Sequence, residues 1–277
     1  MNNLPFYLSQ PFAQHALLAA AIVAIICGFI GPFVIMRGMA FAVHGTSELA
    51  FPGAAAGLLI ANNPLAGALV GTLVFATIIG LLGVRERERD SVIGVILAFG
   101  LGMGVLLLSF YHGFAAEATS ILFGNIFGAG NGQLLALVLI GAGATLAMLI
   151  LYRPLLFASV DPDVAEARGV PLRLVGLLFL LILAFAVTEA AQIVGTLLVL
   201  SLAITPAAAA QRLSARPIMV TTLSILFALI ASVGGLLVSL ANGRLKASVC
   251  ITFVSFGIYL AARVFSYRSS QAGPSRA

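Results

Sequence analysis

The chain has 277 residues, of which 61% are apolar and 8% are charged. This composition excludes a soluble domain, because a soluble domain of this length needs far more charge to cover its surface. The net charge is +5, but the cations are too scattered along the sequence to form the basic face of a nucleic-acid-binding protein. We therefore expect one membrane domain over residues 1–277, in contact with the lipid bilayer and without a nucleic-acid partner.

Nine apolar runs follow one another along the chain. They are Ala16–Met36, Met39–Ile60, Leu65–Val84, Ser91–Tyr111, Leu134–Tyr152, Leu174–Val187, Ile193–Ala210, Ile218–Leu240 and Ala247–Val264. A spanning helix needs about 20 mostly apolar residues, so the runs predict an all-α polytopic bundle of about nine transmembrane helices, with eight as the alternative. The second run contains His44 and Glu48, and the seventh contains Pro206, which is expected to kink or end its helix. Either run could therefore be a broken or re-entrant helix.

The positions of Lys and Arg predict the orientation of the bundle. With the N-terminus outside, twelve of the fourteen cations fall in cytoplasmic segments, and only Arg244 and Lys246 fall outside. An odd number of spans preserves this alternation. It places the C-terminus, with a polar tail over about residues 268–277, in the cytoplasm.

Two glycine pairs predict close helix packing. Gly53 and Gly57, and Gly100 and Gly104, each form a G-x-x-x-G pattern, which allows two helix backbones to approach each other.

His44 and Glu48 are ionisable residues inside an otherwise apolar run. Four residues apart on a helix, they lie on the same face. An imidazole and a carboxylate together can ligate zinc, and less selectively manganese or iron. Ionisable groups at membrane depth are costly and usually face a pathway or a partner. The pair is thus a candidate metal site, and the alternative is a His–Glu hydrogen bond that locks two helices.

The longest cytoplasmic connection is expected between Arg153 and Arg173. Residues 161–168 predict a short helix, with an acidic start at Asp161 and an end at Gly169. Such a helix could dock on a cytoplasmic partner, or it could be a capped surface helix with no partner.

The outer side is expected to carry two acids, Glu117 and Glu189, with His112 in the same loop as Glu117. They could draw cations toward an outer entrance of the pathway, or they could be ordinary loop residues. The sequence has no G-x-x-x-x-G-K-[ST] phosphate loop, no G-x-S-x-G elbow and no H-E-x-x-H motif. We therefore do not expect an enzyme, and any ATP must be bound by another chain.

Several stretches together resemble the membrane permease subunit of the bacterial ABC importers for zinc, manganese and iron. In the order of that family they are GPFVIMRGMAF, HGTSELAFPGAAAG, RERDSVIGVILAFGLGMGVLLLS, LFGNIFG, YRPLLFASVDPDVAEARGVP and QIVGTLLVLSLAITPAAAAQRLS. They cover most of the chain and leave out only its two ends. The resemblance implies a homodimeric permease in the bacterial cytoplasmic (inner) membrane, two cytoplasmic ABC ATPase subunits and an extracytoplasmic solute-binding protein that delivers the metal.

The resemblance also implies roles for two groups of residues. The stretch VDPDVAEARG looks like the coupling helix that sits in a cleft of the ATPase. Its residues are Asp161, Asp163, Val164, Ala165, Glu166, Ala167, Arg168 and Gly169. The family usually has Asp and, four residues later, His ahead of Leu-Pro-Gly. Here His44 stands at the Asp position and Glu48 at the His position, ahead of the sequence FPG, so one imidazole and one carboxylate are retained in exchanged order.

The expected function is the permease subunit of an ATP-driven importer of divalent metal ions, with no permanently bound cofactor. His44 and Glu48 of two protomers offer up to four transient ligands. Zinc is favoured because it suits imidazole with carboxylate, and manganese or iron come next. The alternatives are an ABC permease for iron chelates or cobalamin, an ion-driven secondary transporter and a membrane scaffold. A secondary transporter predicts inverted repeats, which we do not find, and a scaffold leaves the His–Glu pair unexplained.

Overall fold

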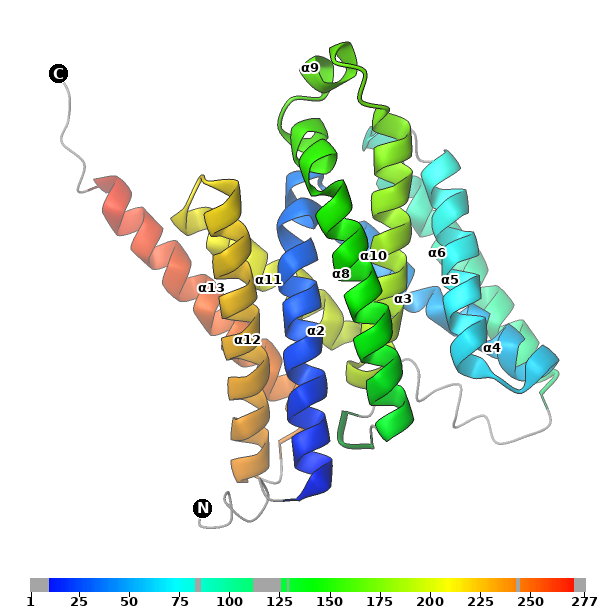
Figure 1. Ribbon diagram of the computed structural model, residues 1–277. Coiled ribbons are helices and arrows are strands. Elements are labelled where there is room, and N and C mark those ends of the chain that lie inside the picture. Colours follow the sequence, from blue (N-terminus) through cyan, green and yellow to red (C-terminus); the bar gives the residue numbers. More distant parts are fainter. Residues whose placement is uncertain (1–9, 83–85, 112–125, 129, 243–244, 272–277) are drawn as a thin grey trace.

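The computed structural model describes residues 10–82, 86–111, 126–128, 130–242 and 245–271, and within these ranges the chain is helical with no β-strand (Figure 1). The α-helices are α2 (Pro11–Met36), α3 (Ala40–Glu48), α4 (Ala50–Ala61), α5 (Pro64–Leu82), α6 (Glu86–Ser109), α8 (Asn131–Val160), α9 (Pro162–Ala167), α10 (Leu172–Val194), α11 (Thr196–Leu213), α12 (Pro217–Asn242) and α13 (Ala247–Gln271). One 3₁₀ turn, η1 (Ile126–Gly128), lies between α6 and α8.

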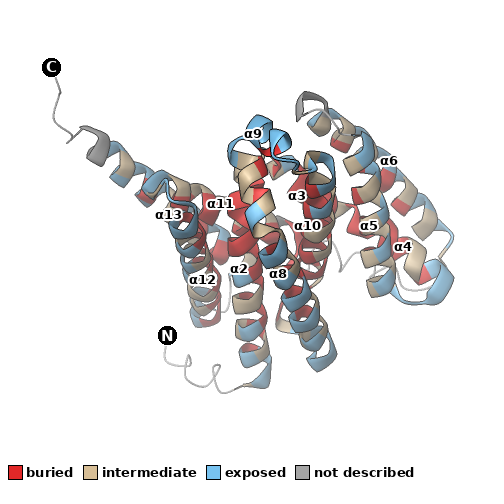
Figure 2. Ribbon diagram, turned by 45° about the horizontal axis from the view of Figure 1, so that its top comes forward, coloured by how far each residue is buried: buried red, intermediate tan, exposed pale blue. Residues whose placement is uncertain are grey.

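Seven of these helices are long and apolar enough to cross a membrane, namely α2, α5, α6, α8, α10, α12 and α13. Helices α2 and α10 form the centre of the bundle, since 67% and 61% of their most apolar stretches are buried. Figure 2 shows buried residues on the inward sides of the helices and exposed residues on the outward sides. Many exposed side chains on the outer helices are large and apolar, as expected for a surface that contacts lipid. The prediction of a polytopic helical membrane protein is confirmed.

The second predicted run is a broken helix. It divides at Leu49 into α3 and α4. The prediction that this run could be a broken helix is confirmed. The residues at the break pack against Gly100 and Gly104 of α6. Leu49 packs against the position where Gly100 lacks a side chain, and a Cβ at Gly104 would lie 2.7 Å from Cδ1 of Phe51. Small residues on α6 therefore fix where the break lies.

Helices α4 and α5 form a tight hairpin (Figure 1). A Cβ at Gly53 would lie 2.5 Å from the carbonyl oxygen of Gly67, and one at Gly57 would lie 2.5 Å from the Cα of Gly67. The hairpin turns at Asn62, whose φ of 52° is left-handed, a conformation that Asn tolerates better than most residues. The close packing predicted from the glycine pairs is confirmed.

The boundary between the sixth and seventh runs differs from the prediction. Helix α10 continues past Val187 to Val194, and the chain breaks at Gly195, which has a φ of 93°. The predicted end was too early because Thr188 and Glu189 lower the local hydropathy, yet both are buried inside the bundle. Pro206 does not end the seventh run, since α11 continues through it to Leu213.

The connection predicted from Arg153 to Arg173 is shorter than expected. Helix α8 continues through Pro154 to Val160, so the first eight residues of the predicted connection are helical. What remains between α8 and α10 is residues 161–171, which contain α9. The end of the bundle that carries α9 is called the α9 end below; in Figure 1 it is at the top.

Candidate functional site

His44 and Glu48 lie on one face of α3, as predicted. The Nε2 atom of His44 is 3.6 Å from Oε1 of Glu48, and the two side chains are 31% and 24% exposed. This distance exceeds an ordinary N–H···O hydrogen bond, so the two groups are close without being locked together. Both side chains are partly exposed, so a cation could reach them.

The other polar side chains of α3 are satisfied within the helix. The hydroxyl of Thr46 donates to the carbonyl oxygen of Ala42 at 2.8 Å, and that of Ser47 donates to the carbonyl oxygen of His44 at 2.8 Å. Both hydroxyls belong to buried residues. Gly45 faces α6, where an added Cβ would lie 2.5 Å from Cγ2 of Ile93. The small face of α3 is thus buried against the bundle, and His44 and Glu48 lie on its accessible side together with Phe41.

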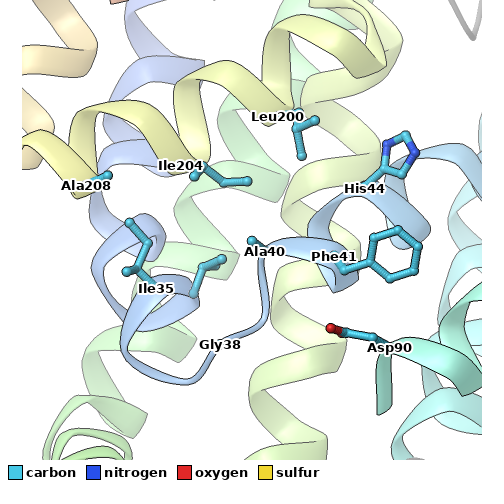
Figure 3. Close-up of a pocket in the computed structure, with 10 residues that line it drawn as sticks. Ile35, Gly38, Ala40, Phe41, His44, Asp90, Leu200, Ile204 and Ala208 are labelled. Atoms are coloured by element: carbon cyan, nitrogen blue, oxygen red, sulfur yellow. The ribbon is translucent and has the colours of Figure 1, made fainter. Parts of the chain in front are cut away.

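A cavity of about 620 Å³ opens beside His44, between α3, the end of α2 and α11 (Figure 3). Its lining is mostly apolar and comprises Val34, Ile35, Gly38, Ala40, Phe41, Leu200, Ile204 and Ala208, together with His44 and Asp90. The ring of Phe41 lies 6.0 Å from the imidazole of His44. A mostly apolar wall with few polar groups is typical of a site that selects a small ligand by those few groups.

Asp90 is the member of this lining that sequence reasoning missed. It belongs to α6, far from His44 in sequence, and Figure 3 places both side chains around the same cavity. The available signal was weak: Asp90 is the last charge before the apolar part of α6, a place where a solvated, orientation-setting residue is equally expected.

The described residues of one chain hold no complete set of metal ligands. In the part of the chain that the structure describes, no three His, Cys, Asp or Glu side chains come together to hold a metal ion. A transition metal needs four to six donors, and His44 with Glu48 provides one imidazole and one carboxylate. Among the described residues this pair alone would leave a transition metal short of donors.

Helix α9 forms where the sequence predicted a short helix. A carboxylate oxygen of Asp161 accepts a hydrogen bond from the backbone N–H of Val164 at 3.1 Å, which caps the helix N-terminus. Gly169 ends the turn with a φ of 82°. Ala165 is fully buried, whereas Val164 is 43% exposed. The helix is therefore anchored on one side and presents an apolar side chain on the other.

Of the two acids predicted on the outer side, only Glu189 belongs to the described residues. Glu189 lies on α10 and is only 2% exposed, and its Oε2 atom has no hydrogen-bond partner among the described residues. It does not face solvent in this conformation. Glu117 and His112 lie outside the described residues. That Glu117 and Glu189 draw cations toward the pathway stays a prediction.

A polytopic helical bundle with an accessible His–Glu pair and a capped helix at one end is a membrane transport protein in its architecture. The model of the ABC 3 transport family matches residues 9–266 of this chain. The chain belongs to this family, and its predicted membership among the permeases of bacterial zinc, manganese and iron ABC importers is confirmed. It is a multi-pass transport subunit of the bacterial cytoplasmic membrane, and its relatives are permeases rather than enzymes.

Two manganese transport permeases are similar to this chain over nearly their full length. The manganese transport system membrane protein MntC of Halalkalibacterium halodurans is 32% identical over 271 residues, which is 96% of this chain and 92% of that protein. The manganese import system permease protein ScaB of Streptococcus parasanguinis is 30% identical, over 90% of this chain and 89% of that one.

Solved structures show the same fold. PsaBC from Streptococcus pneumoniae, in complex with Fab, aligns with a TM-score of 0.82 at 28% identity, over 94% of each chain. A putative metal-chelate type ABC transporter in an inward-facing conformation aligns with a TM-score of 0.67 at 15% identity, over 91% of this chain and 85% of that chain. The second likeness concerns the fold alone.

Proposed function

We propose that this permease imports a divalent transition metal ion, with manganese as the preferred cargo. The observation that carries the proposal is the accessible His44–Glu48 pair, with its atoms 3.6 Å apart, in a chain 32% identical to a manganese transport permease. An ion that passes through must be held weakly, and two donors per protomer suit transient binding. The ion would be released by an extracytoplasmic solute-binding protein, and ATP would be hydrolysed by separate cytoplasmic subunits.

A second copy of the chain completes the ligand set in this proposal. Two protomers related by a two-fold axis would offer two imidazoles and two carboxylates. The exposed fractions of His44 and Glu48, and the open cavity beside them, support a site that faces a partner rather than the interior of one bundle. Four donors are enough for a tetrahedral ion, and carboxylates that bind through both oxygens raise the number toward six.

The choice of metal rests on two observations that point in different directions. The donor pair alone favours zinc, because imidazole with carboxylate suits that ion. The relatives are named as manganese systems, and manganese accepts carboxylate oxygens and higher coordination numbers. We give the relatives more weight, since the same two donor types can serve either ion. Zinc is the second candidate.

We further propose nine membrane crossings, with the N-terminus outside and the α9 end in the cytoplasm. Seven helices qualify by length and composition. Helices α2 and α5 both run toward the α9 end, so the α3–α4 pair has to return the chain between them (Figure 1). By the same reasoning α11 returns the chain between α10 and α12. The positions of Arg and Lys support the cytoplasmic assignment.

Helix α9 is our proposed coupling helix. Residues Asp161 to Gly169 project beyond α8 and α10 (Figure 1). A rigid, capped helix joined directly to two spanning helices can transmit a movement of the ATPase to the bundle. The exposed Val164 is the apolar side chain that we expect to enter the cleft of the partner.

The test is metal accumulation in a bacterial strain that lacks its own importers and carries this permease with its ATPase and binding protein. We expect manganese content to rise with the wild type and to fall by about tenfold or more with His44→Ala or Glu48→Ala, because each removes a ligand. Membrane expression has to be equal across the strains.

A matched control separates ligation from packing. The double variant His44→Asp with Glu48→His keeps one imidazole and one carboxylate, in the order that the family usually has, and should retain uptake. Full accumulation in both alanine variants would reduce the pair to helix packing. No accumulation of manganese, zinc or iron with the wild type would favour a metal chelate as the cargo.

A further inference from the structure

Asp90 is an acidic side chain on the cavity beside His44, and it has no role in the proposed function so far. It belongs to α6 and is exposed, whereas His44 belongs to α3. Figure 3 shows the carboxylate of Asp90 directed toward the cavity, at the level of the loop at Gly38, with His44 on the far side of the Phe41 ring. The mostly apolar cavity therefore has an imidazole at one end and a carboxylate at the other.

Asp90 lies closer than His44 to the α9 end of the bundle. Helix α2 ends at that end, and α3 begins at Ala40 directly after the loop that follows, so His44 lies about one turn along α3. The part of α6 that can span the membrane, Arg89–Ser109, also begins at the α9 end (Figure 1), and Asp90 is its second residue. Ends of spanning helices lie near the polar headgroups. Asp90 is thus near the membrane surface that the proposed function assigns to the cytoplasm.

One stripe of α11 forms a wall of the cavity. Leu200, Ile204 and Ala208 follow one another at intervals of four residues, so they share one face of the helix. Figure 3 shows Leu200 on the side of His44 and Ala208 on the side of α2. These side chains carry no atom that can ligate a metal. An ion that moves along this stripe is therefore not held by it.

The cavity is large enough for a hydrated ion. Its volume of about 620 Å³ corresponds to on the order of 20 water molecules, since each occupies about 30 Å³ in the liquid. Water and carboxylate oxygens are ligands that suit manganese. A metal ion can therefore leave His44 with water in its coordination shell, and it does not have to enter apolar surroundings bare.

The cation next to Asp90 in sequence is turned toward another cavity. The Nη1 atom of Arg89 donates to the carbonyl oxygen of Arg37 at 3.4 Å, and Arg89 lines a cavity between α5, α8 and α10. Consecutive residues of a helix point about 100° apart. Arg89 and Asp90 thus face different cavities, and the carboxylate is the group that faces the cavity of His44.

We propose that Asp90 is a second binding position for the transported metal ion, which it holds through the ion's water shell on the cytoplasmic side of the His44–Glu48 pair. This inference rests on the proposed function. A fixed negative charge at a cavity with low-dielectric walls raises the local concentration of cations. One carboxylate binds a hydrated divalent ion weakly, so the ion is drawn away from His44 and is then released. Asp90 would speed the release into the cytoplasm without selecting the metal.

The test is manganese uptake into proteoliposomes that contain the permease with its ATPase and receive the binding protein from outside. We expect Asp90→Asn to lower the maximal rate of uptake by about threefold to tenfold, because the attraction toward the exit is lost. The external manganese concentration that gives half of this rate should not rise, since Asp90 acts after the ion has passed the His44–Glu48 pair. Asp90→Glu should keep the wild-type rate. The defect of Asp90→Asn should shrink at high salt in the lumen, where charges are screened.

A rescue variant separates the charge of Asp90 from its packing. Gly38 also lines the cavity, it is exposed, and an added Cβ there meets nothing within 4 Å. Its φ of 61° is left-handed, a conformation that Asp and Asn adopt more readily than other side chains. Asp90→Asn with Gly38→Asp returns a carboxylate to the cavity from another element and should restore most of the uptake. The matched control, Asp90→Asn with Gly38→Asn, adds nearly the same bulk without the charge and should not.

Uptake at the wild-type rate by Asp90→Asn would overturn the proposal. Equal uptake by the two double variants would also overturn it, and would assign Asp90 to the structure of α6. The same preparation tests the proposed function through the wild type and His44→Ala. If uptake is lost in His44→Ala and unimpaired in Asp90→Asn, the proposed function stands and the role of Asp90 alone is removed. No uptake by the wild type would contradict the proposed function itself, and the role of Asp90 with it.

Discussion

Single glycines on α6 lie against the break that directly follows the His–Glu pair. Phe51 packs against Gly104, and Leu49 packs against Gly100. Leu49 is the residue between the end of α3 and the start of α4. The ring of Phe51 and the Cα of Pro52 lie where a Cβ on Gly104 would be. Glu48 directly precedes this break, so the position of its carboxylate depends on how closely α6 approaches.

We predict that Gly104→Ala destabilises the protein and impairs uptake, whereas Gly102→Ala does neither. The new Cβ at residue 104 would lie 2.7 Å from Phe51, which is only 5% exposed and has little room to move. Such overpacking costs about 1–3 kcal/mol. At Gly102 an added Cβ meets nothing within 4 Å, and Ala is the better helix former there.

A thiol-reactive dye can measure this difference in thermal midpoint. Cys27 and Cys250 are free and buried, so they become reactive only when the bundle opens. A midpoint for Gly104→Ala equal to that of Gly102→Ala would show that α6 yields to the added methyl group, and that the contact with Phe51 does not position the break.

At the scale of elements, α9 is short and depends on its cap. A helix of 6 residues has almost no stability of its own, and tertiary contacts and caps have to maintain it. The carboxylate of Asp161 satisfies one of the free N–H groups at the start of α9. At the other end, the backbone N–H of Val170 donates to the carbonyl oxygen of Ala165 at 3.0 Å.

We predict that Asp161→Ala lowers the metal imported per ATP hydrolysed, while Asp161→Asn does not. Alanine removes the cap at a cost of about 1 kcal/mol, whereas asparagine caps as well as aspartate. The measurement is uptake and ATP hydrolysis in proteoliposomes that contain the whole complex. If Asp161→Asn were as impaired as Asp161→Ala, the charge of Asp161 would matter instead of the cap.

The elements also show how far hydropathy alone predicts this fold. Each apolar run corresponds to a helix or, for Met39–Ile60, to a pair of helices. The predicted helix ends were wrong where a polar residue or a proline lies inside a helix that continues past it. Glu189 marks the predicted end of a span but is buried within α10, and Pro154 and Pro206 lie inside helices that continue past them. Window averages cannot detect a polar residue that neighbouring helices enclose.

The candidate site was partly predictable for a similar reason. The four-residue spacing of His44 and Glu48 fixes their common face, because that geometry is local to one helix. The place of Asp90 on the same cavity depends on how α6 packs against α3, through the contact of Gly45 with Ile93. Such a juxtaposition is non-local and leaves no periodic signal in the sequence.

At the scale of the whole molecule, two features of the single chain fit a larger assembly. His44 and Glu48 are two potential metal donors, and α9 presents Val164 with 43% of its surface exposed. Both features are explained if the transporter is assembled from two permeases and separate ATPases. Such an assembly requires that α9 and the opposite end of the bundle lie on opposite sides of the membrane.

This requirement leads to a prediction about orientation. Val164 lies on α9, and Asn131 begins α8 at the opposite end of the bundle (Figure 1). Both residues are exposed. If the α9 end is cytoplasmic, a cysteine at residue 131 should react with a membrane-impermeant maleimide in spheroplasts, whereas a cysteine at residue 164 should react only after permeabilisation.

The native cysteines make this comparison clean, because Cys27 and Cys250 are 3% and 6% exposed and should contribute little labelling. The wild-type chain serves as the background measurement, and both single-cysteine additions should first be shown to support metal uptake. Labelling of Val164→Cys from outside, with protection of Asn131→Cys, would invert the topology. It would place α9 away from any ATPase and remove the basis for its coupling role. The expected pattern would instead place the α9 end in the cytoplasm, on the side from which an ATPase can reach α9.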